Sequence, residues 1–192
     1  MQELPEIKKL IGQTIKSLYV VIHNPNYQEP TNVADIAFGF ILHQKPNQFF
    51  VLTTSLEDIW TPLLKTVPFP ELIHNWGEFD AIMSRGKDDD EEDYLIDYEY
   101  FDVSDVKEFS DIVNSEILEI FKIGIIDTEE PFGVRIIFKN DHIMSFPSSD
   151  GNMIETKTFN VNNNLRHFEY LGEIITEKMI DNTPGFFQRL FS

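Results

Sequence analysis

Six short segments rich in β-branched and aromatic residues constrain the fold of this chain more than any other feature. Segments of this kind form strands when turn residues bound them. Short polar stretches join the second and third segments of each half, so these can pair as antiparallel neighbours. The pattern therefore predicts two three-strand meanders. The six predicted strands span residues 14–23, 34–43, 48–54, 117–126, 132–138 and 142–147.

Helical patterns are shorter and fall around these strands. A capping-box pattern at Ser55 predicts a helix start, and Pro68 would end that helix. Ser104 is expected to cap a later helix. The predicted helices and amphipathic stretches cover residues 4–11, the segment from Ser55 to Pro68, 71–83, 105–113 and 183–191. The remaining segments are 153–159, a predicted strand, and 165–180, which fits either a strand or a helix.

Together these patterns predict an α+β fold built mostly of antiparallel sheet, with helices packed on one face. The chain has 192 residues, of which 42% are hydrophobic, so it can bury the core of one ordinary domain. Its 17 phenylalanines indicate a core built largely from aromatic side chains. We therefore expect residues 1–192 to form a single domain.

The two groups of strands can be aligned with each other. The alignment places Phe38-Gly39 opposite Phe132-Gly133. Glycine inside a strand often marks a bulge or a close approach of a bulky neighbour. The alignment predicts an internal repeat over 14–55 and 117–149, joined by an acidic segment over 87–105. The alternative is that any two three-strand meanders look alike at this level.

Charge narrows the choice of partner. The chain carries 33 acidic and 15 basic residues, which gives a net charge of −18. Such a charge disfavours binding to nucleic-acid phosphates or to an anionic membrane. It favours a basic protein partner, whose capture would be fast and sensitive to salt. The alternative is that the acidity only keeps the protein soluble.

The absence of cysteine removes several kinds of chemistry. Without it the chain can form no disulfide, no zinc-thiolate site and no thiol nucleophile. The first residues lack the basic and apolar regions of a secretory signal, and no apolar run approaches the ~20 residues that span a bilayer. The prediction is a cytoplasmic protein.

No motif for catalysis is present. The sequence contains neither a Gly-x-Ser-x-Gly elbow nor a phosphate-binding glycine loop. The acidic run has calcium-ligand types at EF-hand spacing, but Asp93 stands where that loop needs glycine. We therefore predict no catalytic residue, no metal and no cofactor. One alternative stays open: an unfamiliar enzyme with carboxylate and histidine groups between the meanders, which a deep pocket containing His23 or His142 near a buried aspartate would favour.

The acidic segment is the most distinctive surface candidate. Residues 94–100 alternate in a way that suits a strand showing Asp97 and Glu99 beside tyrosines. Tyrosine supplies rigid contact area and carboxylates pair with arginine or lysine, so this segment suits an interface. The alternative is a solvated loop and a strand whose tyrosines pack inward. The predicted partner-binding residues are Asp88, Asp89, Asp90, Glu91, Glu92, Asp93, Tyr94, Asp97, Tyr98, Glu99, Tyr100, Phe101 and Asp102.

In overall character the chain resembles the immunity proteins of bacterial polymorphic-toxin and contact-dependent systems. The shared features are small size, the missing cysteine, the absent catalytic motif, the strand-rich α+β pattern and the acid run over 88–102. The resemblance implies a protein that neutralises a basic toxin domain by covering its active site. It implies no role for any particular residue. The alternative is a structural or regulatory module with a different partner.

Overall fold

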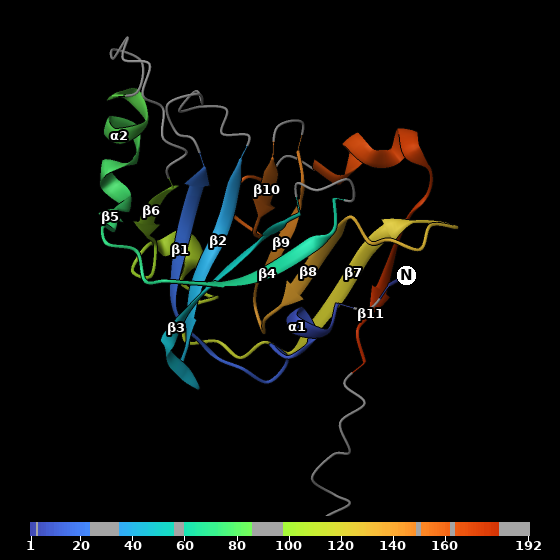
Figure 1. Ribbon diagram of the computed structural model, residues 1–192, viewed down its shortest axis with the longest axis horizontal. Coiled ribbons are helices and arrows are strands. Elements are labelled where there is room, and N and C mark those ends of the chain that lie inside the picture. Colours follow the sequence, from blue (N-terminus) through green and yellow to red (C-terminus); the bar gives the residue numbers. More distant parts are fainter. Residues whose placement is uncertain are drawn as a thin grey trace, which may run out of the picture.

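The computed structural model contains two β-sheets (Figure 1). It describes residues 1–2, 4–23, 35–55, 60–85, 98–148, 151–161 and 164–180. The fold is thus a strand-rich α+β arrangement, with one mixed sheet and one antiparallel sheet.

The first sheet has six strands. Its neighbours pair antiparallel, except that β5 runs parallel to β6. The first three strands in chain order form a meander, to which β4 adds at one edge and β6 and β5 at the other. In spatial order the strands are β4 (Pro62–Val67), β3 (Lys45–Thr54), β2 (Ile36–Leu42), β1 (Ile15–His23), β6 (Tyr98–Asp102) and β5 (His74–Asn75).

The second sheet has five strands, all antiparallel. It also contains a meander of three consecutive strands, extended at one edge by the next strand in the chain and at the other by the last described strand. In spatial order the strands are β10 (Asn152–Glu155), β9 (His142–Pro147), β8 (Gly133–Ile137), β7 (Glu119–Ile125) and β11 (Ile174–Lys178). The six strands predicted from the sequence are confirmed as β1, β2, β3, β7, β8 and β9.

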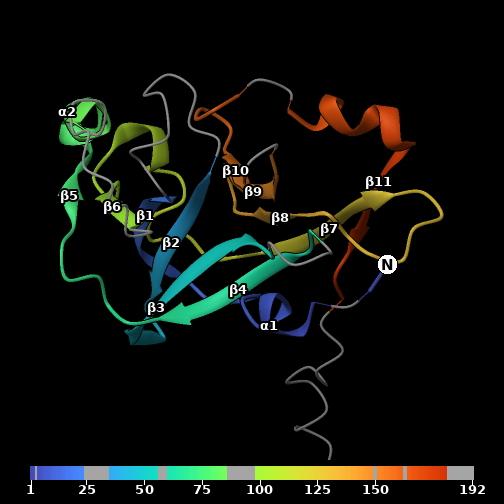
Figure 2. The ribbon, with the colours of Figure 1, turned by 45° about the horizontal axis from the view of Figure 1, so that its top comes forward.

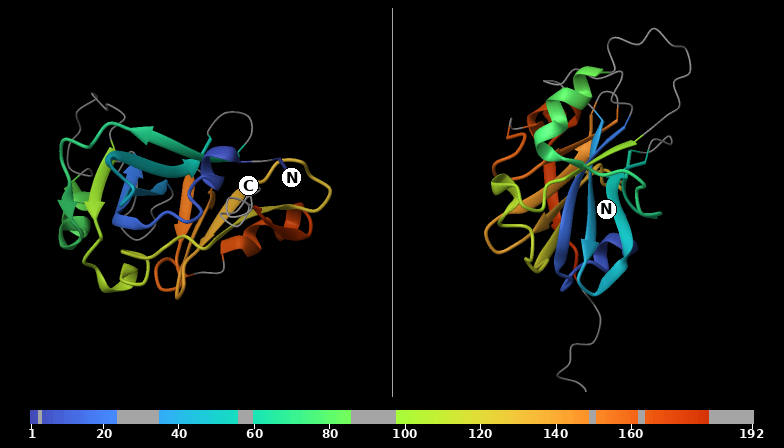
Figure 3. Two further views of the ribbon diagram at one scale, coloured as in Figure 1. Left: turned by 90° about the horizontal axis from the view of Figure 1, so that it is seen from below. Right: turned by 90° about the vertical axis from the view of Figure 1, so that its left-hand side faces the viewer.

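The main core lies between the two sheets. Side chains alternate between the faces of a strand, so every second residue of a strand points to the same side. Phe38 and Phe40 of β2 lie in the same buried cluster as Ile120 of β7 and Val134 of β8. The two sheets therefore share one apolar layer, and Figure 3 shows the blue and teal strands and the orange and yellow strands as separate layers.

The helical segments are distributed around the sheets and are not gathered on one face. Trp76 and Phe79 pack against the shared core, whereas Leu165 and Phe168 pack on the outer face of the five-stranded sheet. The orange-red helix of Figure 2, near β11, is this second element. No described helix is long and apolar enough to cross a membrane. The segments are α1 (Pro5–Lys8), η2 (Trp76–Glu78), α2 (Phe79–Arg85), η3 (Lys107–Phe109) and η4 (Asn164–Leu171).

Three local predictions are wrong. The end of the helix predicted after Ser55 is strand β4, whose Pro62 occupies the first position of an edge strand, where proline is tolerated. The helix predicted over 105–113 is reduced to the single turn η3, and the Ser104 hydroxyl, expected to cap that helix, instead accepts the backbone N–H of Leu18 at 3.1 Å. The polar stretch expected to join the second and third predicted strands is also shorter than predicted, because residues 45–47 belong to β3.

Both strand glycines permit the close approach expected of them. A Cβ placed on Gly39 would lie 2.7 Å from the ring of Phe49, which crosses over β2. A Cβ on Gly133 would lie 3.2 Å from Cβ of Phe146. In each sheet a phenylalanine therefore packs over the backbone of the second strand of the meander. The internal repeat over 14–55 and 117–149 stays a prediction.

Candidate functional site

The outer face of the six-stranded sheet carries the best candidate site. The face turned away from the core bears its own apolar cluster, formed by side chains of the sheet's strands, with Tyr19, Phe49 and Tyr100 among them. No helix of the described chain contributes to this cluster. A hollow of about 210 Å³ lies on this face. Its lining residues are Val21, His23, Asp35, Ala37, Val51, Thr53, Thr54, Lys65, Val67, Tyr98 and Tyr100.

Strand pairing assembles the hollow in rows that run across the sheet. In the first row Tyr98 pairs with His23. The backbone N–H of His23 donates to the backbone carbonyl of Asp35 at 3.1 Å. The second row joins Tyr100, Val21 and Ala37. Since the register fixes these neighbours, residues that are far apart in the sequence meet on one surface.

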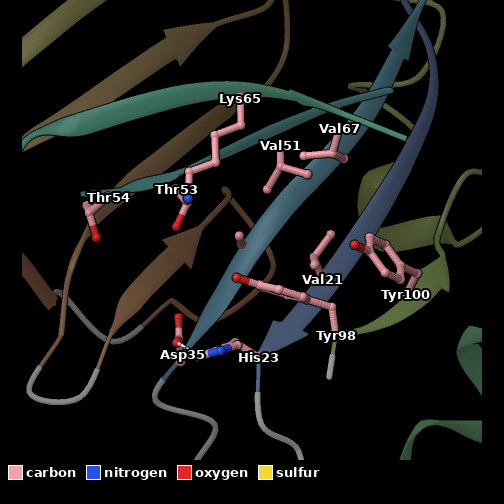
Figure 4. Close-up of a pocket in the computed structure, with 11 residues that line it drawn as sticks. Val21, His23, Asp35, Val51, Thr53, Thr54, Lys65, Val67, Tyr98 and Tyr100 are labelled. Atoms are coloured by element: carbon pink, nitrogen blue, oxygen red, sulfur yellow. Dashed lines mark hydrogen bonds and ion pairs between the residues drawn. The ribbon is translucent and has the colours of Figure 1, made fainter. Parts of the chain in front are cut away.

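The third row brings in lining residues from β3 and β4. It runs from Asp102 through Tyr19, Gly39 and Val51 to Lys65 on β4. Lys65 is therefore two strands away from β2, the strand that Asp35 precedes. Figure 4 shows His23 and Asp35 together at one end and Lys65 at the other.

His23 and Asp35 form a tight pair at the first end. The Nδ1–H of His23 donates to Oδ2 of Asp35 at 2.7 Å, and both side chains are less than a fifth exposed. The other carboxylate oxygen accepts the backbone N–H of Asn152 from the second sheet at 3.1 Å. A Cβ at Gly151 would overlap this carboxylate, so the glycine leaves the space that Asp35 occupies.

Asn152 anchors this end of the hollow to the core. Its side chain is fully buried, donates to the Ile36 carbonyl at 2.7 Å and accepts the Ser145 hydroxyl at 2.9 Å. A buried amide with both groups bonded fixes the position of the strands that it joins. Asp35 is therefore held by both sheets.

Tyrosines form the wall of the hollow on the β6 side. The Tyr98 ring lies 4.8 Å from the His23 ring and 6.4 Å from the Tyr100 ring, centroid to centroid. Burial, and then the negative charge of Asp35, raise the pKa of Tyr98. Burial, followed by Tyr98, raises the pKa of Tyr100. Both phenols are therefore neutral at physiological pH, and the field of Asp35 reaches Tyr98.

The structure divides the predicted partner-binding residues. Tyr98 and Tyr100 share the outer face, with Tyr98 48% exposed. Glu99 points to the other side, where Nε2–H of His74 donates to its carboxylate at 2.7 Å. The expectation that Glu99 lies beside the tyrosines is therefore wrong, because successive strand residues face opposite ways. The predictions for Asp88, Asp89, Asp90, Glu91, Glu92, Asp93, Tyr94 and Asp97 lie outside the described residues, as does the terminal helix over 183–191.

Two further members of the predicted set have structural roles. Phe101 is fully buried and its ring packs 5.3 Å from the ring of Phe79, so it belongs to the core. Asp102 accepts the Ser104 N–H at 2.8 Å, which holds the turn after β6. Neither residue lines the hollow. Among the described residues no group of three or more acidic or histidine side chains is placed to hold a metal ion.

The site includes residues that the sequence did not single out. The sequence indicates His23 only for the enzyme alternative, and no pattern in it indicates Asp35. A signal was available, because the two residues flank the same loop between two strands predicted to pair. The hollow also lies on an outer face, not between the meanders, and His142 does not line it.

Comparison with protein-family models, curated proteins and solved structures finds no match for this chain.

Proposed function

We propose that this chain is a protein-binding module that captures a basic partner through the outer face of its six-stranded sheet. In the cell it would act as a cytoplasmic immunity protein that neutralises a cognate bacterial toxin. The single observation that carries the proposal is the pair Tyr98 and Tyr100, which line a hollow on a face without a described helical cover. Half-exposed tyrosine is among the residue types most enriched at interface hot spots.

Charge supports the choice of a basic partner. The chain carries a net charge of −18, and four residues of the sequence separate the acid run over 88–93 from the strand that bears the tyrosines. Long-range attraction would speed the encounter, while the tyrosines would supply contact area after docking. The complex should therefore weaken as salt rises.

The first test identifies the partner. The tagged protein is used to capture proteins from its native cell lysate at low and at high salt. A single basic protein is expected at low salt, and it should be toxic when expressed alone and harmless when co-expressed with this chain. An acidic partner, or a captured protein whose toxicity this chain does not relieve, would refute the immunity role.

The second test locates the contact surface. Tyr98→Ala should lower affinity for the captured partner by roughly thirtyfold, which corresponds to the ~2 kcal/mol of an interface hot spot. Tyr170→Ala is the matched control. Tyr170 is 83% exposed and lies on η4, which packs on the five-stranded sheet and not on the six-stranded one. Equal affinity of the Tyr98→Ala variant and the control would show that Tyr98 on β6 does not contact the partner.

A second candidate function is favoured by one specific observation. The 2.7 Å bond between His23 and Asp35 has the arrangement in which a carboxylate orients a histidine for general-base catalysis. A panel of chromogenic ester and phosphoester substrates would reveal such an activity. Turnover that disappears in a His23→Gln variant would support an enzyme, whereas turnover that persists in it would come from a contaminant.

A further inference from the structure

The hollow combines aromatic walls with a partly buried carboxylate. Tyr98 and His23 present rings at 4.8 Å, and Asp35 adjoins His23 at the same end. Aromatic faces attract cations electrostatically, and the attraction grows where water is excluded. This combination of groups suits a positively charged ligand.

The balance of charge also favours a cation at this end. The Asp35 side chain is only 15% exposed, so solvent screens its charge weakly. Lys65, the opposing charge, also lines the hollow, but it is exposed on β4 and its ammonium extends towards Thr53, away from the His23 and Asp35 pair (Figure 4). The charge of Asp35 contributes to the raised pKa of Tyr98, so it acts on the aromatic wall. Asp35 is therefore the negatively charged group that adjoins the aromatic wall.

The size of the hollow indicates a side chain in preference to a whole small molecule. Pockets for drug-sized ligands run from roughly 300 to 1,000 Å³. The hollow, at about 210 Å³, is smaller. One long side chain supplied by a larger partner would fill it.

We propose that the hollow is an anchor pocket for a single arginine side chain of the partner. The planar guanidinium would stack on Tyr98 and be attracted by Asp35, and its shape suits stacking better than the compact ammonium of lysine does. The inference rests on the proposed function, because it names the group by which the basic partner docks.

The test uses the full chain and a minimal probe. N-acetyl-arginine amide is titrated into the 15N-labelled protein, with the neutral isostere N-acetyl-citrulline amide as the matched control. Saturable shifts are expected at the backbone amides of the hollow, with at least about tenfold weaker binding of the citrulline compound. Absence of saturable shifts, or equal binding of both compounds, would overturn the inference.

Variants locate the binding within the hollow. Tyr98→Ala and Asp35→Asn should each weaken arginine-amide binding by about tenfold, while Lys65→Gln should tighten it and Tyr170→Ala should leave it unchanged. Asp35 also joins the two sheets, so circular dichroism must first establish that Asp35→Asn folds. If it does not, Tyr98→Ala and Lys65→Gln decide the question, and unchanged affinity in both would refute the pocket.

The two proposals can fail separately. A neutralised basic toxin whose binding depends on Tyr98, together with no response to the arginine probe, would leave the proposed function standing and remove the anchor pocket. Conversely, specific arginine binding together with a captured acidic partner would support the pocket and refute the proposed function.

Discussion

Glu155 on β10 is a carboxylate that the fold holds largely out of water. Its side chain is buried, and one of its oxygens accepts the side-chain N–H of Asn164 at 3.0 Å. Burial raises the pKa of Glu155 above its usual 4.5, although the hydrogen bonds from Asn164 and the charge of Arg135 oppose the shift. The folded state therefore holds this proton more tightly than the unfolded chain does.

The stability contribution of this group has a definite sign. Because the folded pKa is raised, its contribution is fully present below the unfolded pKa and is lost as pH rises through the folded pKa. Glu155→Gln keeps an acceptor for Asn164 and removes the charge. We expect the variant to unfold at higher urea concentration than wild type at pH 8, with the gain shrinking as pH falls towards 4.5.

Urea unfolding curves across that pH range, followed by circular dichroism, measure this difference. Glu129→Gln is the matched control, because Glu129 is exposed and should gain little at any pH. A Glu155→Gln variant less stable than wild type at pH 8 would mean that the charged carboxylate is stabilising in the fold, contrary to the argument.

Residue identity alone predicted only part of the candidate site. Tyrosines at alternating positions indicated a contact surface, and Tyr98 and Tyr100 do share a face. Phe101 could not be separated from them, because exposure depends on which face of β6 meets the core. The pair of His23 and Asp35 depends on the register between two strands, which the sequence constrains only through the loop that joins them.

At the scale of a strand, Gly39 shows how closely packing restricts β2. A Cβ on this residue would lie 2.7 Å from the fully buried ring of Phe49 and 3.0 Å from Val21. Gly39→Ala should therefore lower the free energy of unfolding by about 1–3 kcal/mol, the usual cost of overpacking. That cost exceeds the roughly 0.5–1 kcal/mol that alanine gains over glycine within a strand.

Chemical denaturation of three variants tests this packing. Gly77→Ala is the control, since nothing lies within 4 Å of the added Cβ, and it should be neutral or slightly stabilising. Phe49→Leu combined with Gly39→Ala should be less destabilised than the sum of the single variants, because the smaller side chain leaves room for the methyl group. Additive losses would show that the contact between the two positions is not the cause.

Elements were predictable where a local pattern and the packing agree. The β-branched and aromatic runs of the two meanders form strands because one face of each is buried against the other sheet. The prediction for the segment that forms β4 was wrong, because Pro62 and the preceding capping box are also compatible with the start of a helix. What decides for strand is pairing with β3, a long-range interaction that local propensity does not contain.

At the scale of the whole molecule, repulsion between negative charges opposes folding. A net charge of −18 on 192 residues produces self-repulsion in the compact state. Among the described residues the buried contacts that join the sheets are mainly apolar, with Asn152 as a polar link. Salt should therefore change the stability chiefly by screening the repulsion between surface carboxylates, because modest ionic strength has little effect on apolar contacts in the core.

Raising sodium chloride from 20 to 300 mM should increase the melting temperature, because the Debye length falls from above 20 Å to below 10 Å. A gain of about 1 kcal/mol would correspond to a rise of roughly 2–4 °C for a chain of this size. Differential scanning calorimetry measures the shift, and potassium chloride at equal concentration is the control for specific sodium binding. Over the same range the proposed complex should dissociate more readily, since attraction to a basic partner is screened as well. An unchanged or lower melting temperature would show that close ion pairs, such as Lys122 with Glu177 at 3.4 Å, outweigh the repulsion between distant carboxylates.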